Sequence, residues 1–499
     1  MPFQIQLTFY YASASRMGDP LDKPVTLRLE YSQDHVRHIN GILVSLEHQR
    51  TFSNNSAGTI HEYTAVLVPR IWKLYLNTAS RVFRNKKLDK IVDEVMKEQG
   101  IPGSDYKQAY AASAGKELSW MGGPRFGAEF RAQYRETDLD FISRLLEEFG
   151  ITYLFKHNER RHELHMVNKA EQLPVCNPAR LGLATPAGQG PSTAYRFSRR
   201  RQLTAQGVCI RDHNPSSTSP SLSQGAGADS VSLFNDYPGG FNSDGQGKAL
   251  AQIRLEEIKA GQVTFQGESD CIGLIPGHTF KLTGANPGSN MNRDYMVVRV
   301  HHSAANADPD TRFMDHILHY RNSFECVDKS VPYRPPRVTP RPSVRGVQTA
   351  TVVGPDNGTV ATGRPHLDAS GRVQICFHWQ KFNSAGDCPW VRVAQRMGDS
   401  PDGEVTRGGM HWPRVGDEVV VEFLEGDPDR PLVTGTVYAT DNDYPGPRDP
   451  TASEAIPTLA GKDDKVATEA ASVTVHNDHR NLIQDGATEF SMVDDGAAR

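Results

Sequence analysis

The chain has 499 residues, a formal net charge of −4, 37% hydrophobic residues and 23% charged residues. This composition is typical of a globular protein of about three domains, and its charge gives no whole-chain argument for binding nucleic acid or an anionic membrane. No apolar run approaches the roughly 18 residues of a membrane span, and no signal-peptide pattern opens the chain, so we expect folding in the cytoplasm.

Apolar and polar residues alternate at the start of the chain. The pattern runs from Phe3 to Phe9 and returns at residues 25–29. Alternation with a period of two predicts half-buried β-strands.

Two later segments have apolar residues at helical spacing. The first, residues 88–99, ends at Gly100, and the second, residues 138–149, follows Thr137 and ends at Gly150. Thr is a favoured N-cap residue and Gly readily adopts the left-handed conformation that stops a helix. The sequence therefore predicts two amphipathic helices with defined ends.

The middle of the chain contains three kinds of segment. Residues 214–230 have almost no core-forming side chains and predict a surface loop or insertion, whereas residues 248–260 predict a helix. Residues 332–344 hold five prolines and three arginines, which indicates an extended, polyproline-like strap between domains. A ligand for an SH3-type groove is the alternative for this segment.

Short Val-, Phe- and Trp-rich runs separated by turn residues fill residues 372–438. About five strands in so short a segment predict a small barrel of the OB type, because an open sheet would leave its edges bare. The sharpest turn lies between Glu425 and Pro431, where Gly426 can supply positive φ. We expect Gly416 and Gly426 each to occupy a conformation that a Cβ resists.

Residues 441–499 form an acidic segment with twelve Asp or Glu against five Lys or Arg, a net charge of −7. The six cysteines show no CxxC spacing, so we expect buried, reduced thiols and neither a zinc knuckle nor a disulfide framework. They are Cys176, Cys209, Cys271, Cys326, Cys376 and Cys388.

Motifs for hydrolase nucleophiles, phosphate loops, dinucleotide binding and zinc proteases are absent from the sequence. The nearest approach is His162 and His165, but they stand three apart in a segment that alternates like a strand. Strand periodicity puts them on opposite faces, so we expect neither to bind metal.

Other polar clusters have simpler explanations than a site. Adjacent His301 and His302 diverge on a strand, and His476 with His479 lacks a third ligand, so solvated or hydrogen-bonded histidines are favoured. The basic run Arg199 to Arg201 has no interleaved aromatics and is interpreted as solvated.

Acidic residues also gather in the sharp turn of the predicted barrel. Glu425, Asp427 and Asp429 resemble a paired-carboxylate site, but they flank the turn proline Pro428. We expect them to serve the turn and to form an ion pair with Arg430 at its rim. No catalytic, cofactor-binding or metal-binding residue is therefore predicted.

Three blocks of sequence together resemble the VgrG family, the spike proteins of type VI secretion systems. GGMHWPRVGDEVVVEFLEGDPDRPLVTGTVY, preceded by GRVQICFHW and CPWVRVAQ, resembles the family's OB-fold segment. YRETDLDFISRLLEEFGITYLF resembles the hub part that VgrG shares with phage tail baseplate hubs. Trp412 stands where the family commonly has an aliphatic residue, and we interpret it as core or interface variation.

The resemblance implies a mainly β fold with an α+β hub. It divides the chain into a phage-hub-like region of two barrel-like domains with helical insertions (1–331), a proline-rich linker (332–345), a five-stranded OB-fold barrel (346–440) and an acidic extension (441–499). ATEFSMVDDG near the end is similar to the motif through which the family enters a trimeric β-helix needle, so we expect the short start of a truncated needle. The family also has further β structure ahead of the first strand.

The function implied by the resemblance is structural. A homotrimer would serve as the spike of a contractile injection machine, puncture a target membrane on transient contact and carry effectors on its tip. Implied partners are an Hcp-like tube protein at the hub end and a PAAR-like tip protein, effector or adaptor at the needle end, with no cofactor and no nucleic acid. Assembly would take place in the bacterial cytoplasm, before secretion or injection without a signal peptide.

Two other classes of function are alternatives to a structural spike. One is a cell-wall hydrolase, for which residues 439–499 are too few and too polar to form a catalytic domain. The other is an OB module of a phage-tail-like particle that binds glycans or nucleic acid, which leaves most of the chain unexplained.

Overall fold

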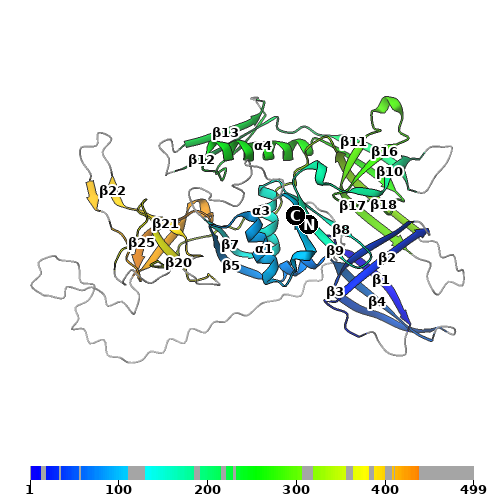
Figure 1. Ribbon diagram of the computed structural model, residues 1–499, viewed down its shortest axis with the longest axis horizontal. Coiled ribbons are helices and arrows are strands. Elements are labelled where there is room, and N and C mark those ends of the chain that lie inside the picture. Colours follow the sequence, from blue (N-terminus) through cyan, green and yellow to red (C-terminus); the bar gives the residue numbers. More distant parts are fainter. Residues whose placement is uncertain are drawn as a thin grey trace, which may run out of the picture.

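The fold is described from a computed structural model of the chain. The structure describes residues 2–12, 18–32, 35–54, 58–110, 130–184, 192–214, 221–228, 232–305, 319–355, 364–380, 387–398, 407–409 and 411–437. It is mainly β, which confirms the predicted fold class, and it contains two closed barrels. Figure 1 shows the barrels toward opposite ends of an elongated molecule, with helices between them.

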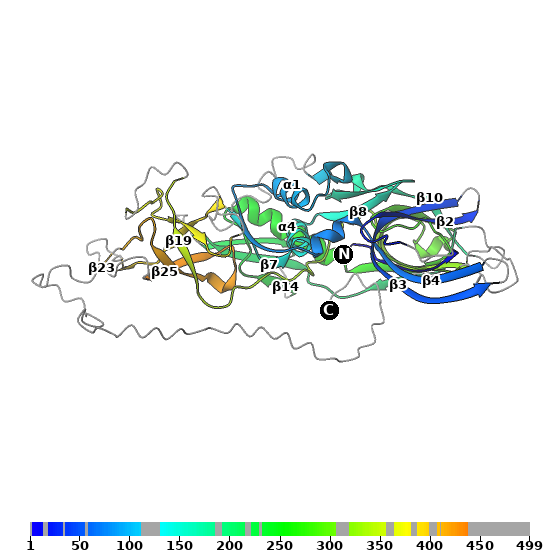
Figure 2. The same ribbon diagram turned by 90° about the horizontal axis from the view of Figure 1, so that it is seen from below.

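Four antiparallel strands form a sheet in the order β1-β4-β3-β2. They are β1 (Ile5–Ala12), β2 (Pro24–Ser32), β3 (His35–Asn54) and β4 (Gly58–Val68). The predicted alternation is confirmed, because apolar side chains from Phe3 to Phe9 pack against a core that includes Leu43 and Leu67. The sheet curls in Figure 2 but stays open among the described residues, whereas two barrel-like hub domains were expected.

An α/β region follows and carries both predicted amphipathic helices. Its elements are η1 (Arg70–Tyr75), β5 (Thr78–Arg84), α1 (Leu88–Glu98), η2 (Gly103–Asp105), β6 (Tyr106–Gln108), β7 (Phe130–Thr137), α3 (Asp138–Glu148), β8 (Thr152–His157), β9 (His162–Val167) and η4 (Ala170–Gln172). The side chain of Thr137 accepts a hydrogen bond from Asp140 N at 3.0 Å, and Gly150 has φ +64°. Both ends of α3 thus form as expected, and its apolar face packs against that of α1 in one core.

Six strands close the first barrel in the order β10-β11-β15-β18-β17-β16. They are β10 (Val175–Leu183), β11 (Thr193–Arg201), β15 (Val263–Ser269), β16 (Thr279–Thr283), β17 (Asp294–Ala305) and β18 (His319–Asp328), with η5 (Pro287–Ser289) between β16 and β17. Phe265, Phe280 and Tyr295 fill its interior. Arg37 of β3 donates to Ile272 O at 2.7 Å, so the open sheet contacts this barrel directly.

The helix predicted at residues 248–260 is confirmed as α4 (Asp244–Ala260), which lies on a small sheet ordered β13-β12-β14. The strands are β12 (Gly207–His213), β13 (Ser221–Gly227) and β14 (Leu233–Asp236). Assigning all of residues 214–230 to a loop was wrong, because β13 pairs with β12 along its whole length. Small residues allow the close approach, since a Cβ at Gly247 of α4 would meet Gln224 of β13 at 2.6 Å.

The second barrel has the five strands that the sequence predicted, closed in the order β19-β20-β21-β25-β24. They are β19 (Gln348–Val352), β20 (Val373–Phe377), β21 (Trp390–Val393), β24 (Glu418–Phe423) and β25 (Pro431–Val437), with a side hairpin of β22 (Arg396–Gly398) and β23 (Arg407–Gly409). The predicted turn is the short η7 (Leu424–Gly426) with the residues after it, and Gly416 and Gly426 have φ of +97° and +72°. The turn assignment is therefore confirmed.

One expectation about the cysteines is wrong. Cys376 at the end of β20 and Cys388 just before β21 form a disulfide, with their Cα atoms 4.9 Å apart. The pairing of Val373 with Val391 sets the register that brings these cysteines face to face. Sequence spacing did not reveal the pair because the register of two strands brings it together. Of the other four cysteines, all reduced, three are buried and Cys209 is half-buried.

The expected start of a β-helix needle, with His476 and His479, falls at residues 438–499, outside the described residues. In the part of the chain that the structure describes, none of the helices has the length and apolar character needed to span a membrane.

Candidate functional site: a buried ionic joint

Charged residues lie buried where the second barrel meets the α/β region. Arg144 of α3 forms a bidentate ion pair with Glu136, with Nε–Oε2 and Nη2–Oε1 distances of 2.8 and 2.7 Å. The Nη2 atom of Arg144 also donates a hydrogen bond to Ala132 O. Burial raises the pKa of Glu136, while the facing Arg144 guanidinium opposes that shift. A bidentate arginine is the partner that best offsets the desolvation of a carboxylate.

The turn of the second barrel enters this charged cluster. Asp429, 2% exposed, accepts a hydrogen bond from Ala132 N at 2.7 Å and pairs with Arg131 of β7 at 3.4 Å. Arg131 also pairs with Glu148 of α3 at 3.4 Å. One carboxylate of the barrel is therefore bound to both the backbone and a side chain of β7.

The expectation of an ion pair at the rim between the turn acids and Arg430 is corrected by this geometry. Arg430 is buried and pairs with Asp212 of β12 at 3.5 Å, while Asp427 pairs with Arg341 of the strap. Glu425 alone of the three acids is exposed. We call the buried set of Arg131, Glu148, Asp212, Asp427, Asp429 and Arg430 the ionic joint.

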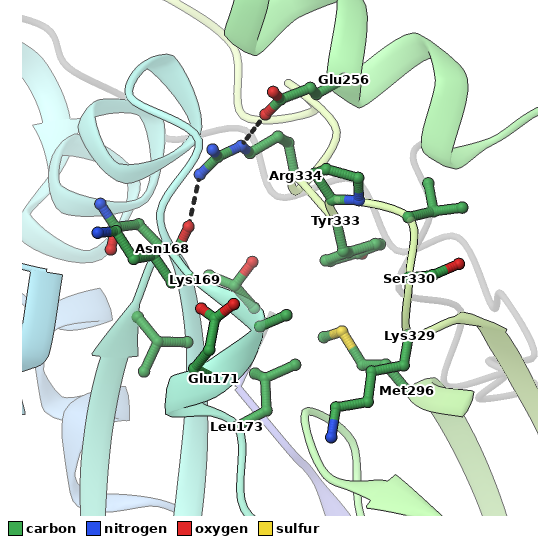
Figure 3. A pocket seen from close by; sticks show the side chains of 15 residues that line it. Asn168, Lys169, Glu171, Leu173, Glu256, Met296, Lys329, Ser330, Tyr333 and Arg334 are labelled. Atoms are coloured by element: carbon green, nitrogen blue, oxygen red, sulfur yellow. Dashed lines mark hydrogen bonds and ion pairs between the residues drawn. The ribbon is translucent and has the colours of Figure 1, made fainter. Parts of the chain in front are cut away.

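The predicted proline-rich strap runs along the hub and is anchored by its arginines. Arg334 pairs with Glu256 of α4 at 2.7 Å and donates to Asn168 O and Gly150 O at 2.8 and 3.1 Å, as Figure 3 shows in part. Arg337 lies 3.8 Å from Glu257 of the same helix. Residues 332–344 form neither helix nor strand, and the segment is attached to the hub.

The second half of the strap is fixed by a single glutamate of α3. The Glu147 carboxylate accepts hydrogen bonds from the backbone N–H groups of Val338 and Thr339 at 3.1 and 3.0 Å and from the Thr339 hydroxyl at 2.7 Å. Burial raises the pKa of Glu147, and these three donors oppose that shift. Farther along, Arg341 lies 3.6 Å from both Glu148 and Asp427, so the strap ends in the ionic joint.

A cavity of about 620 Å³ opens beneath the start of the strap. Leu173, Met296 and Tyr333 supply apolar surface, and Lys169 and Glu171 lie across the cavity from Lys329 and Ser330 in Figure 3. Its lining comes from the α/β region, helix α4, barrel strand β17 and the start of the strap with the residues just before it. The cavity therefore marks the place where these parts of the hub converge.

The histidines singled out in the sequence have separate partners. His162 Nε2 accepts a hydrogen bond from Arg70 N at 3.2 Å, whereas His165 Nε2 contacts Glu163 at 3.1 Å. His302 contacts the Tyr320 hydroxyl inside the barrel, and His301 is exposed. Among the residues with described positions, no group of three or more His, Cys, Asp or Glu side chains lies close enough together to hold a metal ion.

The basic run from Arg199 to Arg201 lies on β11 with all three side chains exposed, as a solvated face requires. The ionic joint itself was missed by sequence reasoning. For the neighbouring pair of Arg144 and Glu136 one signal existed, since Arg144 follows Phe141 by three residues and so occupies the apolar face of α3.

The chain was compared with known protein families. The phage tail baseplate hub (GPD) family matches residues 1–308, and the type VI secretion system/phage-baseplate injector OB domain matches residues 357–438. The chain therefore belongs to the phage tail baseplate hub family.

Curated relatives narrow the class within that family. The chain is 31% identical to the type VI secretion system spike protein VgrG1b of Pseudomonas aeruginosa and 30% identical to VgrG1a of the same organism, each over 85% of this chain. The matches cover 55% and 63% of those relatives, so the chain spans little more than half of their length. The resemblance to VgrG spike proteins is confirmed.

Solved structures share the fold. The E. coli c3393 protein, described as a component of the type VI secretion system similar in structure to T4 bacteriophage tail proteins gp27 and gp5, superposes with a TM-score of 0.59 at 19% identity. That superposition covers 88% of this chain and 93% of the other. A Francisella PdpA-VgrG complex gives a TM-score of 0.51 at 10% identity, covering 88% of this chain and 73% of the matched chain.

Proposed function

We propose that the chain is one third of a homotrimeric spike that acts mechanically and without catalysis. The ionic joint is the observation that carries the proposal, because it fixes the OB barrel to the hub through buried charge pairs with β7 and β12. Separating those charges would leave them buried without partners, which is costly. A spike that transmits force along its axis needs such a stiff connection.

The proposed machine is a contractile injection system that drives the trimer through a target membrane with effectors on its tip. The fold of c3393 and the VgrG relatives support this assignment. The proposal includes an Hcp-like tube protein below the hub and a PAAR-like tip protein, effector or adaptor at the needle end. It also includes assembly in the bacterial cytoplasm followed by secretion or injection.

The proposed division of the chain follows the same logic. We assign residues 1–331 to the hub, 332–345 to the linker, 346–440 to the OB barrel and 441–499 to an extension toward the needle. The anchored strap supports placing the main boundary at 332–345, because residues on either side of it join different barrels.

The decisive experiment is the mass of the particle in solution at micromolar concentration, measured by light scattering. We expect three times the subunit mass of 55.2 kDa for the full chain. A second sample without residues 441–499 shows whether the extension is needed for association. A stable monomer of the full chain across the concentration range would contradict the trimer.

A further inference from the structure

Three polar side chains meet on neighbouring strands of the open N-terminal sheet. Thr51 Oγ1 of β3 lies 2.9 Å from His48 Nε2 of the same strand and 2.9 Å from His61 Nδ1 of β4. The two ring nitrogens are 3.3 Å apart. The three atoms therefore form a compact triangle.

The triangle has the dimensions of one face of a metal coordination shell. Two nitrogens bound at about 2.0–2.1 Å to a tetrahedral ion stand about 3.3–3.4 Å apart. Neighbouring ligands of a six-coordinate ion at a similar bond length are closer, at about 2.8–3.0 Å. The observed edges of 2.9, 2.9 and 3.3 Å fall within this span.

One pair of histidine tautomers leaves both ring nitrogens of the triangle unprotonated. His61 is 5% exposed, and its Nε2 has no hydrogen-bond partner among the described residues. If His61 carries its proton on Nε2 and His48 carries its proton on Nδ1, then His61 Nδ1 and His48 Nε2 both present lone pairs to a hydroxyl with one proton. A cation is the group that accepts lone pairs from both imidazoles at once.

Neighbouring aromatic rings hold the two imidazoles in place. Tyr63, 3% exposed, lies with its ring centre 5.1 Å from that of His48 and 6.3 Å from that of His61, and it stacks on Phe9 at 5.8 Å. Strand pairing sets Thr51 opposite His61 and His48 opposite Tyr63. Pre-positioned ligands lose little freedom on binding, which favours affinity.

We propose that His48, His61 and Thr51 form a binding site for a divalent transition-metal ion of the Zn²⁺, Ni²⁺ or Cu²⁺ type. The two imidazoles are the main ligands, which suits these ions, and the hydroxyl is the third protein ligand. Thr51 is exposed, so water can complete the coordination shell. A bound ion links β3 to β4 within their hairpin.

The test is calorimetric titration of the full chain with Ni²⁺ and Zn²⁺ near neutral pH. All samples carry His476→Ala and His479→Ala, so that the tail histidines contribute nothing. We expect one ion per chain in this background. His48→Ala or His61→Ala should remove that binding.

Further variants separate metal ligation from a structural role of the cluster. Thr51→Val should weaken binding by about tenfold, the usual effect of removing a supporting group at a metal site. His301→Ala, which removes an exposed histidine of β17, should leave binding unchanged. Ni²⁺ should raise the melting temperature of the background protein and of His301→Ala, but not that of His48→Ala.

Two results would overturn the site. One is the absence of stoichiometric binding by the folded background protein, which would make the cluster a hydrogen-bonded triad only. The other is binding that survives in folded His48→Ala, whose half-buried side chain can be removed with less disturbance than that of His61. Neither result bears on the proposed trimer, which has its own measurement.

Discussion

At the scale of single residues, the OB barrel is fixed to the hub by side chains that sequence reasoning assigned to a solvated rim. Asp429 and Arg430 are adjacent in the chain, yet they pair with Arg131 and Asp212 on different strands of the hub. Burial raises the pKa of Asp212, although backbone N–H donors and Arg430 oppose the shift. Burying charged groups this deeply is costly unless each one has a partner.

The first prediction concerns Asp429→Ala. The change removes the acceptor for Ala132 N and one anion from beside Arg131, so it should lower the free energy of unfolding by about 3–5 kcal/mol. Denaturant titration measures the loss. Glu422→Gln, which alters an exposed acid on β24, is the control and should change the free energy by less than about 0.5 kcal/mol. Equal stability of the two variants would show that the joint contributes nothing.

A second prediction concerns Gly426→Val. At φ +72° a β-branched side chain is strained, and its Cβ would lie 2.6 Å from Ser343 Oγ of the strap. We expect a marked fall in melting temperature, and a smaller one for Gly416→Val at φ +97°. Gly435→Val is the matched control, because a Cβ there meets nothing within 4 Å. Unchanged melting of both test variants would contradict the turn geometry.

At the scale of elements, the parts of the hub are held together by the strap and by a junction of three histidines, His157, His162 and His278, where the open sheet, the α/β region and the first barrel meet. Burial lowers the pKa of His157 on β8 to about 3, and its Nδ1 accepts a hydrogen bond from Asn40 N of β3 at 3.0 Å. His162 and Arg37 lie close enough to oppose its protonation. His278 on the barrel has its pKa lowered to about 4, again mainly by burial. The junction is therefore built from neutral imidazoles.

These shifts predict acid sensitivity. A folded-state pKa below the ordinary value of 6.5 means that the unfolded chain binds more protons, so stability is complete above pH 6.5 and falls as pH drops toward the folded pKa. For His157 alone the loss at pH 5 is about 2 kcal/mol. Replacing His157 with Gln should flatten the fall in melting temperature between pH 7 and pH 5. His301→Gln should keep the parental slope, and a His157→Gln protein with that same slope would refute the assignment.

The strap offers a second test at this scale. Arg334→Ala removes an ion pair with Glu256 and two hydrogen bonds to carbonyl oxygens, so the backbone of residues 329–338 should exchange its amide hydrogens faster. Hydrogen-exchange mass spectrometry measures this directly. Arg345→Ala, at an exposed position farther along, should leave exchange in that segment unchanged. Identical exchange in both variants would mean that the arginine does not anchor the strap.

At the scale of the whole molecule, the ionic joint and the strap both hold the OB barrel to the hub. Arg341 touches both Glu148 of the hub and Asp427 of the barrel, so the strap and the joint share partners. Groups that share partners do not contribute independently. The position of the OB barrel relative to the hub should therefore depend on them jointly.

The whole-molecule prediction concerns the double variant Arg334→Ala with Asp429→Ala. We expect a larger radius of gyration by small-angle X-ray scattering than in either single variant, because the barrel swings away from the hub while each barrel stays closed. Circular dichroism verifies that strand content is kept. An unchanged radius with intact strand content would place the rigidity elsewhere.

Much of this protein could be predicted locally. Thr137 and Gly150 mark the ends of α3 through their own conformational preferences, and the turn around Gly426 forms where a glycine and a proline make reversal easy. The order of motifs predicted the hub family and the five-stranded barrel. Strand β13 was missed because its small residues carry no hydrophobic pattern.

The sequence by itself therefore determined the β-rich class, the helices with their caps, the OB barrel with its turn, and the family. Tertiary structure alone decided the partners of Asp429, the anchoring of the strap, the Cys376–Cys388 disulfide and the meeting of His48 with His61. The physical reason is distance along the chain. Neighbouring residues fix backbone conformation, whereas pairs such as Ala132 and Asp429, 297 positions apart, meet only after packing and strand register have been settled.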